Sequence, residues 1–251
     1  MNLVSTSRFL NYWEKLPLSL RLIIKLRLWT AIGAGGVLYL SPIIFNNLGF
    51  SAEQIGSGIT IAAFTGITSR LGTGYFLDKK YSYRKAIKVA CLIALISDII
   101  LFNSKNYLAY LSGQLFLGAA AGIYWPSVEL AVPLNCNNKI KSSEGYALAR
   151  SADAIGVTLG VLIGTIGTYI NFTRIIYLID IIFMIYIFNN LINKLQILKK
   201  NQHLKAEIYK ENTNRKSKKL KEYTWIIGLT PLLSLTLFVT GVMTLLQIIL
   251  P

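Results

Sequence analysis

The sequence predicts an all-α integral membrane protein that crosses the bilayer several times. Of its 251 residues, 53% are hydrophobic and 15% are charged, whereas a soluble domain carries about 25% charged residues. Four long runs contain no Asp, Glu, Lys or Arg: 28–52, 106–128, 154–173 and 223–251. A hydrocarbon core of about 30 Å is spanned by about 20 apolar residues in helical form. Because lipid offers the backbone no hydrogen-bond partners, helices are the expected spanning elements.

Seven spanning helices are expected, separated by polar segments. The second contains Arg70 and the third contains Asp98, but leaving out either helix would invert the distribution of positive charge that follows it. The predicted helices are 28–46, 55–77, 86–103, 107–132, 146–170, 174–192 and 224–250. The predicted domains are an N-terminal cytoplasmic or interfacial segment 1–21, a six-helix bundle 22–192 made of two three-helix units, a basic cytoplasmic loop 193–223, and the seventh transmembrane helix 224–251.

Positive charge is concentrated on one side of this predicted topology. The segments 1–27, 79–88, 139–150 and 194–221 hold most of the Lys and Arg, whereas the other side has Lys105 and Arg174. Since positive residues mark the cytoplasmic side, we expect a cytoplasmic N-terminus and a multi-pass protein of the plasma (inner) membrane. The net charge of +15 sits in short blocks between apolar runs, which favours the lipid bilayer as partner and argues against nucleic acid. Loop 193–223 is either a solvated connector or a contact for anionic lipid.

The inventory of reactive side chains is short. His203 is the single histidine, which excludes a histidine metal cluster or a Ser/His hydrolytic centre within one chain. Cys91 lies in an apolar run and Cys136 in a polar segment, a placement that suggests reduced thiols. We therefore expect no cofactor, no metal and no enzymatic activity.

The most informative motif follows the second predicted helix, where a glycine and an aspartate four residues apart precede a basic turn. The candidate gating residues are Gly74, Asp78, Lys79, Arg84 and Lys85. The segment resembles the loop between helices 2 and 3 of the major facilitator superfamily, G-x-x-x-D-[RK]-x-G-[RK]-[RK]. Its first three conserved positions match in register, while Tyr81 replaces a glycine and the basic pair comes two positions later. In the family this loop latches the two halves together on the cytoplasmic side; an ordinary basic turn is the alternative interpretation.

The fifth predicted helix carries glycines at every fourth position, Gly156, Gly160 and Gly164. Such a stripe is typical of close helix packing. It resembles helix 5 of the same family, whose antiporter signature is G-x-x-x-G-P-x-x-G-G. Val161 replaces the proline and Thr165 the last glycine, so the antiporter assignment is not supported.

The resemblance covers one six-helix half, the central loop and one further helix, whereas the family has twelve helices in two halves. It implies a truncated or split transporter that moves an unknown small-molecule substrate by rocking of two bundles. Such a chain would need a partner, either a second copy in a homodimer or a separately encoded C-terminal half. The alternative is a non-transporting membrane protein or a degenerate transporter fragment.

The resemblance also places the substrate cavity between helices 1, 2, 4 and 5 of this half. The polar residues on those helices that could line it are Tyr39, Asn46, Thr65, Ser69, Gln114 and Trp125. Near their cytoplasmic ends lies an expected inner charge cluster of Arg70, Glu129, Arg150 and Asp153, with Asp78 nearby. The cluster is either a gate or a static network. Asp98 and Asp180 fall on helices 3 and 6, which are scaffold helices in the family, so proton coupling there is not favoured.

Overall fold

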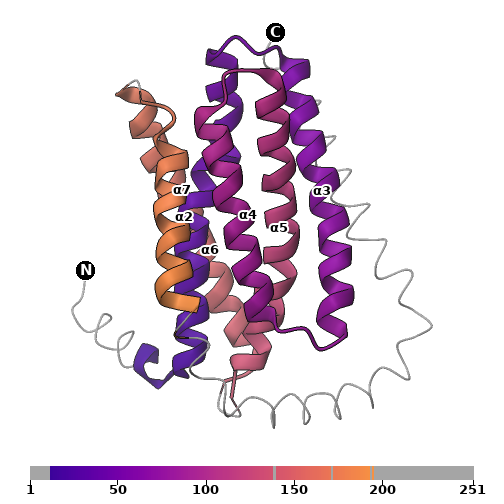
Figure 1. Cartoon of the computed structure of the whole chain (residues 1–251). Coiled ribbons are helices and arrows are strands. Elements are labelled where there is room, and N and C mark those ends of the chain that lie inside the picture. Colours follow the sequence, from indigo (N-terminus) through magenta and orange to yellow (C-terminus); the bar gives the residue numbers. More distant parts are fainter. Residues whose placement is uncertain (1–11, 138–139, 171, 193, 195–251) are drawn as a thin grey trace, which may run out of the picture. The chain divides into compact units, whose positions relative to one another are not determined.

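The computed structural model describes residues 12–137, 140–170, 172–192 and 194, and all of their regular structure is helical. The helices are α2 (Leu18–Asn47), α3 (Ala52–Asp78), α4 (Tyr83–Asn103), α5 (Tyr107–Asn135), α6 (Ser142–Tyr169) and α7 (Ile175–Tyr186), which continues into the π-helical turn η1 (Ile187–Leu191). Successive helices run in opposite directions through the bundle (Figure 1). The predicted loop 193–223, His203 and the predicted seventh helix lie outside the described residues, apart from position 194.

The two ends of the bundle differ in charge. The end that holds the α3–α4 and α5–α6 connections, at the bottom of Figure 1, is called the basic end because Lys79, Lys80 and Lys141 lie there. The opposite end holds Lys105 and Arg174. At the basic end the helices extend beyond their predicted limits, and α2 begins ten residues earlier than expected. Long basic side chains can keep their heads in water while their stems lie along apolar surface, so a charged residue does not end a helix.

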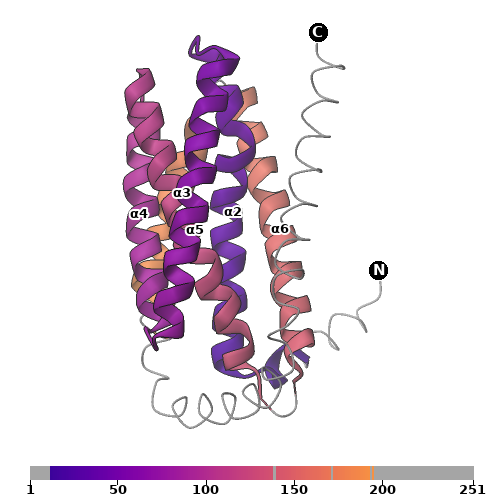
Figure 2. The same ribbon diagram turned by 90° about the vertical axis from the view of Figure 1, so that its right-hand side faces the viewer.

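The helices of the first three-helix unit pack mainly on those of the second. Helix α2 packs on α6, α3 packs on α5, α4 packs on α5, and α7 contacts both α2 and α4. Figure 2 shows α4 at the left, α3 and α5 overlapping beside it, and then α2 and α6 towards the right. The two predicted three-helix units are therefore interleaved, and they do not form separate layers.

Glycines allow the two closest of these helix contacts. A Cβ atom on Gly160 of α6 would overlap the carbonyl oxygen of Ile32 in α2, and one on Gly118 of α5 would overlap the carbonyl oxygen of Ala62 in α3. Gly156 and Gly164 extend the α6 contact along α2. Small residues of this kind let helix backbones approach in lipid.

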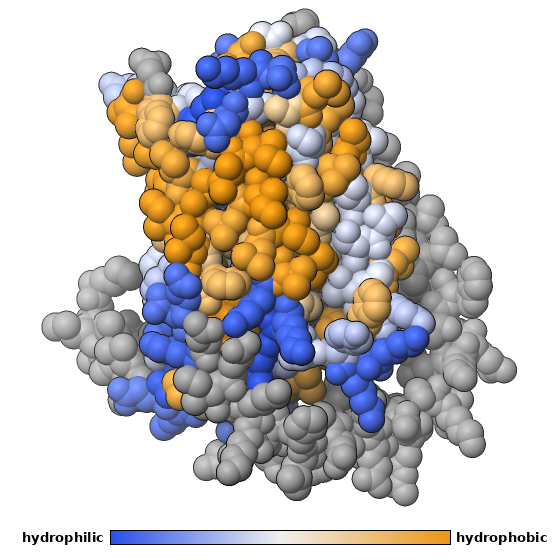
Figure 3. Space-filling view, viewed as in Figure 1, coloured by the Kyte–Doolittle hydropathy of each residue, from blue (hydrophilic) through white to orange (hydrophobic). Residues whose placement is uncertain are grey.

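The surface of the described bundle matches a membrane environment. Figure 3 shows an apolar band over α4 and α7 between two polar rims. The exposed apolar residues of these helices include Val89, Leu92, Ile96, Ile99, Ile182 and Ile185. Four described helices, α2, α4, α5 and α6, are long and apolar enough to cross a bilayer, and α7 with η1 is a shorter apolar helix. The predicted fold class, an all-α integral membrane protein, is confirmed.

Candidate functional site

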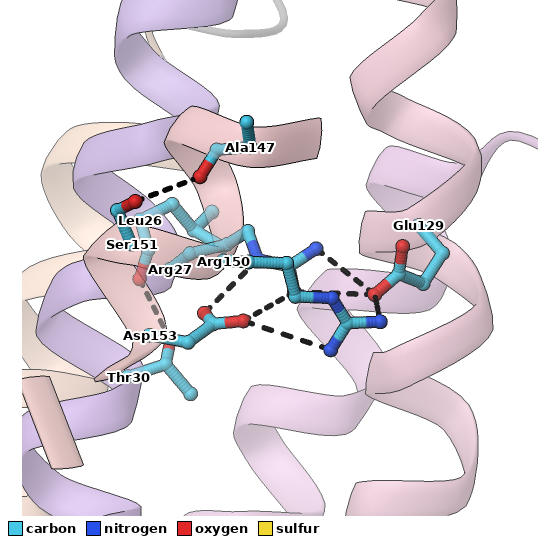
Figure 4. A network of polar contacts seen from close by, with 8 residues as sticks. All are labelled: Leu26, Arg27, Thr30, Glu129, Ala147, Arg150, Ser151 and Asp153. Atoms are coloured by element: carbon cyan, nitrogen blue, oxygen red, sulfur yellow. Dashed lines mark hydrogen bonds and ion pairs between the residues drawn. The ribbon is translucent and has the colours of Figure 1, made fainter. Parts of the chain in front are cut away.

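Arg27 is the centre of the charged network of the described bundle. Its side chain is 0% exposed and enters the interior from α2. The Nε atom donates to Asp153 Oδ1 of α6 at 3.0 Å, and Nη2 pairs with the second oxygen of the same carboxylate. Both terminal nitrogens donate to Glu129 Oε1 of α5, at 3.2 and 3.1 Å (Figure 4). One guanidinium therefore ties three helices together by charge-assisted hydrogen bonds.

Arg150 supplies the second positive charge of this network. Its Nη2 lies 2.8 Å from Glu129 Oε1, and its Nη1 lies 3.9 Å from Asp153 Oδ2. The side chain is 62% exposed, so water weakens its ion pairs. The network thus has one buried arginine, Arg27, and one exposed arginine, Arg150, and each is paired with both carboxylates.

An aromatic ring borders the network on α5. The guanidinium carbon of Arg27 lies 5.6 Å from the ring centroid of Trp125, within range of a cation–π interaction. Tyr146 of α6 donates its hydroxyl to the Glu129 carbonyl oxygen at 3.0 Å. These contacts hold the α5 backbone in place at Glu129, whose side chain belongs to the network.

A cavity of about 390 Å³ opens beside the network at the basic end. Its lining residues come from α3, α5 and α6: Arg70, Trp125, Pro126, Glu129 and Arg150. The volume is within the range of small-molecule sites, about 300–1,000 Å³. Glu129 is already held by two arginines, whereas Arg70 is exposed and has no ion pair with the residues that the structure describes. The cavity wall therefore carries an excess of positive charge.

The structure brings together three of the four residues of the expected inner charge cluster, Glu129, Arg150 and Asp153. Arg70 lies in the wall of the same cavity but outside the ion-pair network. Asp78 is exposed and forms no ion pair within the described residues. It follows Arg70 by eight residues on α3, a rise of about 12 Å, which is too far for the two side chains to meet.

The sequence reasoning missed Arg27 because it began the first helix at residue 28. The signal was present: Leu20, Ile23, Arg27 and Thr30 recur at helical spacing and all are buried. Extending the helix by this periodicity would have placed the arginine on the interior face.

The residues of the expected gating loop do not converge on one point in the described structure. Lys79 lies over the Tyr75 ring at 4.3 Å, and Asp78 and Lys85 are exposed. Arg84 is buried at the start of α4, where its Nε donates to the Tyr83 hydroxyl at 3.2 Å. A Cβ on Gly74 would meet nothing within 4 Å among the described residues. This glycine thus leaves an open place on the α3 surface.

The α3–α4 turn itself has a defined geometry. Lys80 has a positive φ of 68°. The amide of Lys80 donates to the Leu77 carbonyl, and the amide of Tyr81 donates to the Phe76 carbonyl at 3.2 Å. This is a Schellman motif with the left-handed residue directly after the C-cap residue Lys79. The left-handed position falls on Lys80, one residue before the position where the family motif has glycine.

The expected cavity-lining residues occupy three different environments. Trp125 lines the cavity, whereas Tyr39 and Asn46 are exposed on α2. The Thr65 hydroxyl donates to the Leu115 carbonyl of α5 at 3.1 Å, and Ser69 lies against Gly122 of α5. The last two residues thus face the α3–α5 contact.

Gln114 was expected to line the cavity, but its side chain is only 4% exposed and does not line this cavity. It shares a face of α5 with Trp125 but lies eleven residues earlier. At that level the neighbouring helices cover the face. Helical periodicity predicts the face on which a residue lies, but not the depth at which neighbours close over it.

The segment before α2 is tied to α6 at the basic end. Tyr12 donates its hydroxyl to the Glu144 carboxylate. This hydrogen bond, with burial and the nearby negative charge, raises the pKa of Tyr12 to about 12. The phenol therefore stays neutral at physiological pH and holds the start of the described chain against α6.

Comparison with known proteins gives one family. The model of the Major Facilitator Superfamily matches residues 28–251. The match covers the cavity wall and both acidic members of the charged network, and Arg27 lies one residue before it. A search of curated proteins found no match.

Proposed function

Since this chain belongs to the major facilitator superfamily, a family of membrane transporters, we propose that it moves a small solute across the bilayer by alternating access. The observation that carries the proposal is the cavity at the basic end, bordered by an ion-pair network that joins α2, α5 and α6. We call the described bundle of α2 to α7 the half-bundle, because the family has two such bundles. A rigid half-bundle with one open polar wall is the unit that a rocking mechanism requires.

The members of the network divide into a fixed and an exchangeable part. Arg27 is fully buried between two carboxylates, and breaking a buried pair leaves an uncompensated charge. Arg27 therefore keeps the half-bundle rigid during transport. Arg150 and Arg70 are exposed at the cavity, and they supply the charges that meet the solute or an opposing half.

The charge of the cavity wall favours a small anionic solute. Two arginines and one glutamate line it, and Glu129 is already satisfied by hydrogen bonds. Guanidinium groups bind carboxylates and phosphates through paired donors. The Trp125 ring beside them offers an apolar surface to the rest of the solute.

Ligand-induced stabilisation of the purified chain tests this solute class. The probes are small organic carboxylates and phosphates, each paired with its neutral amide or ester. We expect the anions to raise the melting temperature and the Arg70→Gln variant to lose that increase. Lys105→Gln, at the opposite end, is the matched control and should keep it. Equal stabilisation by the neutral analogues would contradict the anionic assignment.

We further propose that a second half-bundle covers the open side of the described one. Large apolar residues remain exposed on α6, at Ile155, Leu162 and Ile166. In the family pattern helix 5 faces the other half, which supports assigning this surface to a protein contact. The second half is a further segment of the polypeptide, a second copy or a separate product.

Photo-crosslinking from single cysteines in native membranes distinguishes these possibilities. Cysteines at Ile155 and Leu162, each carrying a thiol-attached photoreactive group, are expected to crosslink to a polypeptide partner, whereas Ile182→Cys on the exposed apolar surface of α7 should not. Gln114 is unsuitable for this purpose because it is buried. Uncrosslinked chains that transport in liposomes as monomers of this length would refute the need for a partner.

The orientation of the bundle is proposed from its charge. In the plasma (inner) membrane the basic end faces the cytoplasm, because Lys and Arg gather there and are few at the opposite end. In intact cells an impermeant thiol reagent should label Lys105→Cys and spare Lys79→Cys, both made in a Cys136→Ser background. The reverse pattern would invert the topology.

A further inference from the structure

Two carboxyl groups lie fully inside the described bundle, away from the charged network at the basic end. Asp98 of α4 is 0% exposed and Asp180 of α7 is 2% exposed. Asp98 comes five residues before the end of α4, and Asp180 five residues after the start of α7. Both of these helix ends lie at the end of the bundle opposite the basic end. The two aspartates therefore sit at the same depth, about 7 Å inward from the ends of their helices. Helices α4 and α7 pack on each other, so the two buried carboxyl groups lie on neighbouring elements at a common level.

Neither carboxyl group has a compensating positive charge in the described chain. Both oxygens of Asp98 and one oxygen of Asp180 have no hydrogen-bond partner among the residues that the structure describes. The salt bridges of the described residues involve Arg27 and Arg150 only. Arg174, the cation near the start of α7, instead donates to the carbonyl oxygens of Phe102 and Ser104, the latter at 2.8 Å.

The surroundings of the pair are tightly packed on one side and open on the other. Gly33 of α2 lies against Asp180 so closely that a Cβ atom there would overlap the carboxylate. Tyr177 of α7 is near Asp98, and its hydroxyl is engaged with Ser41 at 2.8 Å. Cys91 of α4 is the other titratable neighbour of Asp180. None of these groups supplies a positive charge.

A small cavity of about 70 Å³ reaches Asp180 from the centre of the bundle. Its polar lining includes Thr30 and Tyr124, and the Tyr124 hydroxyl is also buried without a hydrogen-bond partner among the described residues. The space is large enough for a water molecule. Trp125 lines both this cavity and the larger one at the basic end.

An ionised carboxylate without a partner is strongly disfavoured in such an interior, and it is neutralised by binding a proton. Two adjacent carboxylates disfavour the doubly charged state further. A hard metal cation would instead need six or more oxygen ligands, and the described residues contain no cluster of three or more acidic, His or Cys side chains. The proton is therefore the ligand that fits the pair.

We propose that Asp98 and Asp180 form an internal proton-binding site, in which the pair holds at least one proton at neutral pH. This site goes beyond the transport function. The burial and the missing partners support it without any assumption about the solute. If the chain transports as proposed, the proton site and the solute cavity are separate sites, and Trp125 borders both the solute cavity and the small cavity that reaches Asp180.

Infrared difference spectroscopy of the full chain in lipid nanodiscs tests the proposal. A protonated carboxyl group absorbs separately from a carboxylate, and its band shifts in heavy water. The wild type at neutral pH should show such a band. The Asp98→Asn and Asp180→Asn variants should each retain a band at a changed frequency, because the remaining acid is still buried, and the double variant should lose it. Glu53→Gln, an exposed site at the same end of the bundle as the pair, is the matched control and should leave the band unchanged.

Thermal unfolding of the same variants provides a second readout, which remains useful if the double variant does not fold. Replacing a neutral carboxylic acid by the isosteric amide should leave the melting temperature of each single variant close to that of the wild type at neutral pH. The proposal is overturned if the wild type lacks a protonated-carboxyl band, or if neither single variant changes its frequency. Loss of the wild-type band on adding sodium at constant pH would show a cation site instead.

Discussion

The burial of Arg27 sets the stability of the basic end. Its guanidinium contacts two carboxylates on two different helices and has no exposed surface. The neighbouring Arg150 contacts the same carboxylates from the water side. Two arginines thus share the same two acidic partners but differ greatly in their access to solvent. This pair separates the contribution of burial from that of charge.

Replacing Arg27 should destabilise the bundle far more than replacing Arg150. We expect Arg27→Met to reduce the free energy of unfolding by about 3–5 kcal/mol, because it leaves buried carboxylates without their cation. Arg150→Met should reduce it by under about 1 kcal/mol, as is typical of exposed pairs. Reversible unfolding in mixed micelles measures both. Equal losses would mean that burial does not govern this network.

At the scale of single elements, glycine positions determine which helices touch. Gly160 lies against the α2 backbone, whereas a Cβ on Gly72 of α3 would meet nothing within 4 Å among the described residues. Gly160→Ala should therefore separate α6 from α2 and destabilise the bundle by about 1–3 kcal/mol. Gly72→Ala is the control and should be neutral or stabilising by up to about 1 kcal/mol, through helix propensity. Thermal unfolding in detergent compares the two, and a larger loss at Gly72 would contradict the described packing.

The turn between α3 and α4 gives a prediction of opposite sign. Lys80 holds a left-handed conformation that costs a residue with a side chain about 1–2 kcal/mol. Lys80→Gly should stabilise the turn by about 0.5–1 kcal/mol, after allowing for the extra backbone freedom of glycine in the unfolded chain. The same change at Lys79, where φ is −77°, should destabilise it. Melting temperatures of the two variants, which remove the same charge, decide the matter.

The sequence predicted the elements better than their depth. The charge-free runs placed the start of α5 at Tyr107 and the end of α4 at Asn103, as the structure has them. The basic end was placed less well, because Arg27 was taken as a boundary although it lies within α2. For the site, charge spacing grouped Glu129, Arg150 and Asp153. The burial of Gln114 depends on neighbouring helices that no local pattern reveals.

For the whole molecule, the exposed Asp78 separates stability from transport. It forms no ion pair within the described residues, so Asp78→Asn should change the free energy of unfolding by under about 0.5 kcal/mol. If the carboxylate instead serves an opposing half, as the family motif implies, uptake into liposomes should fall while the protein level holds. Wild-type uptake by a well-expressed variant would show that this carboxylate has no gating role.

The interleaved order of the helices has a consequence for biogenesis. The ribosome makes α2 well before α5 and α6, the two helices that carry the carboxylates of Arg27. During that interval a lone guanidinium within the membrane is costly, by about 2.5–3.5 kcal/mol at the centre of a helix. Its long side chain can reach the headgroup layer meanwhile. Insertion of α6 then completes the charge pairing, so α2 enters the bilayer well before its arginine reaches its final environment.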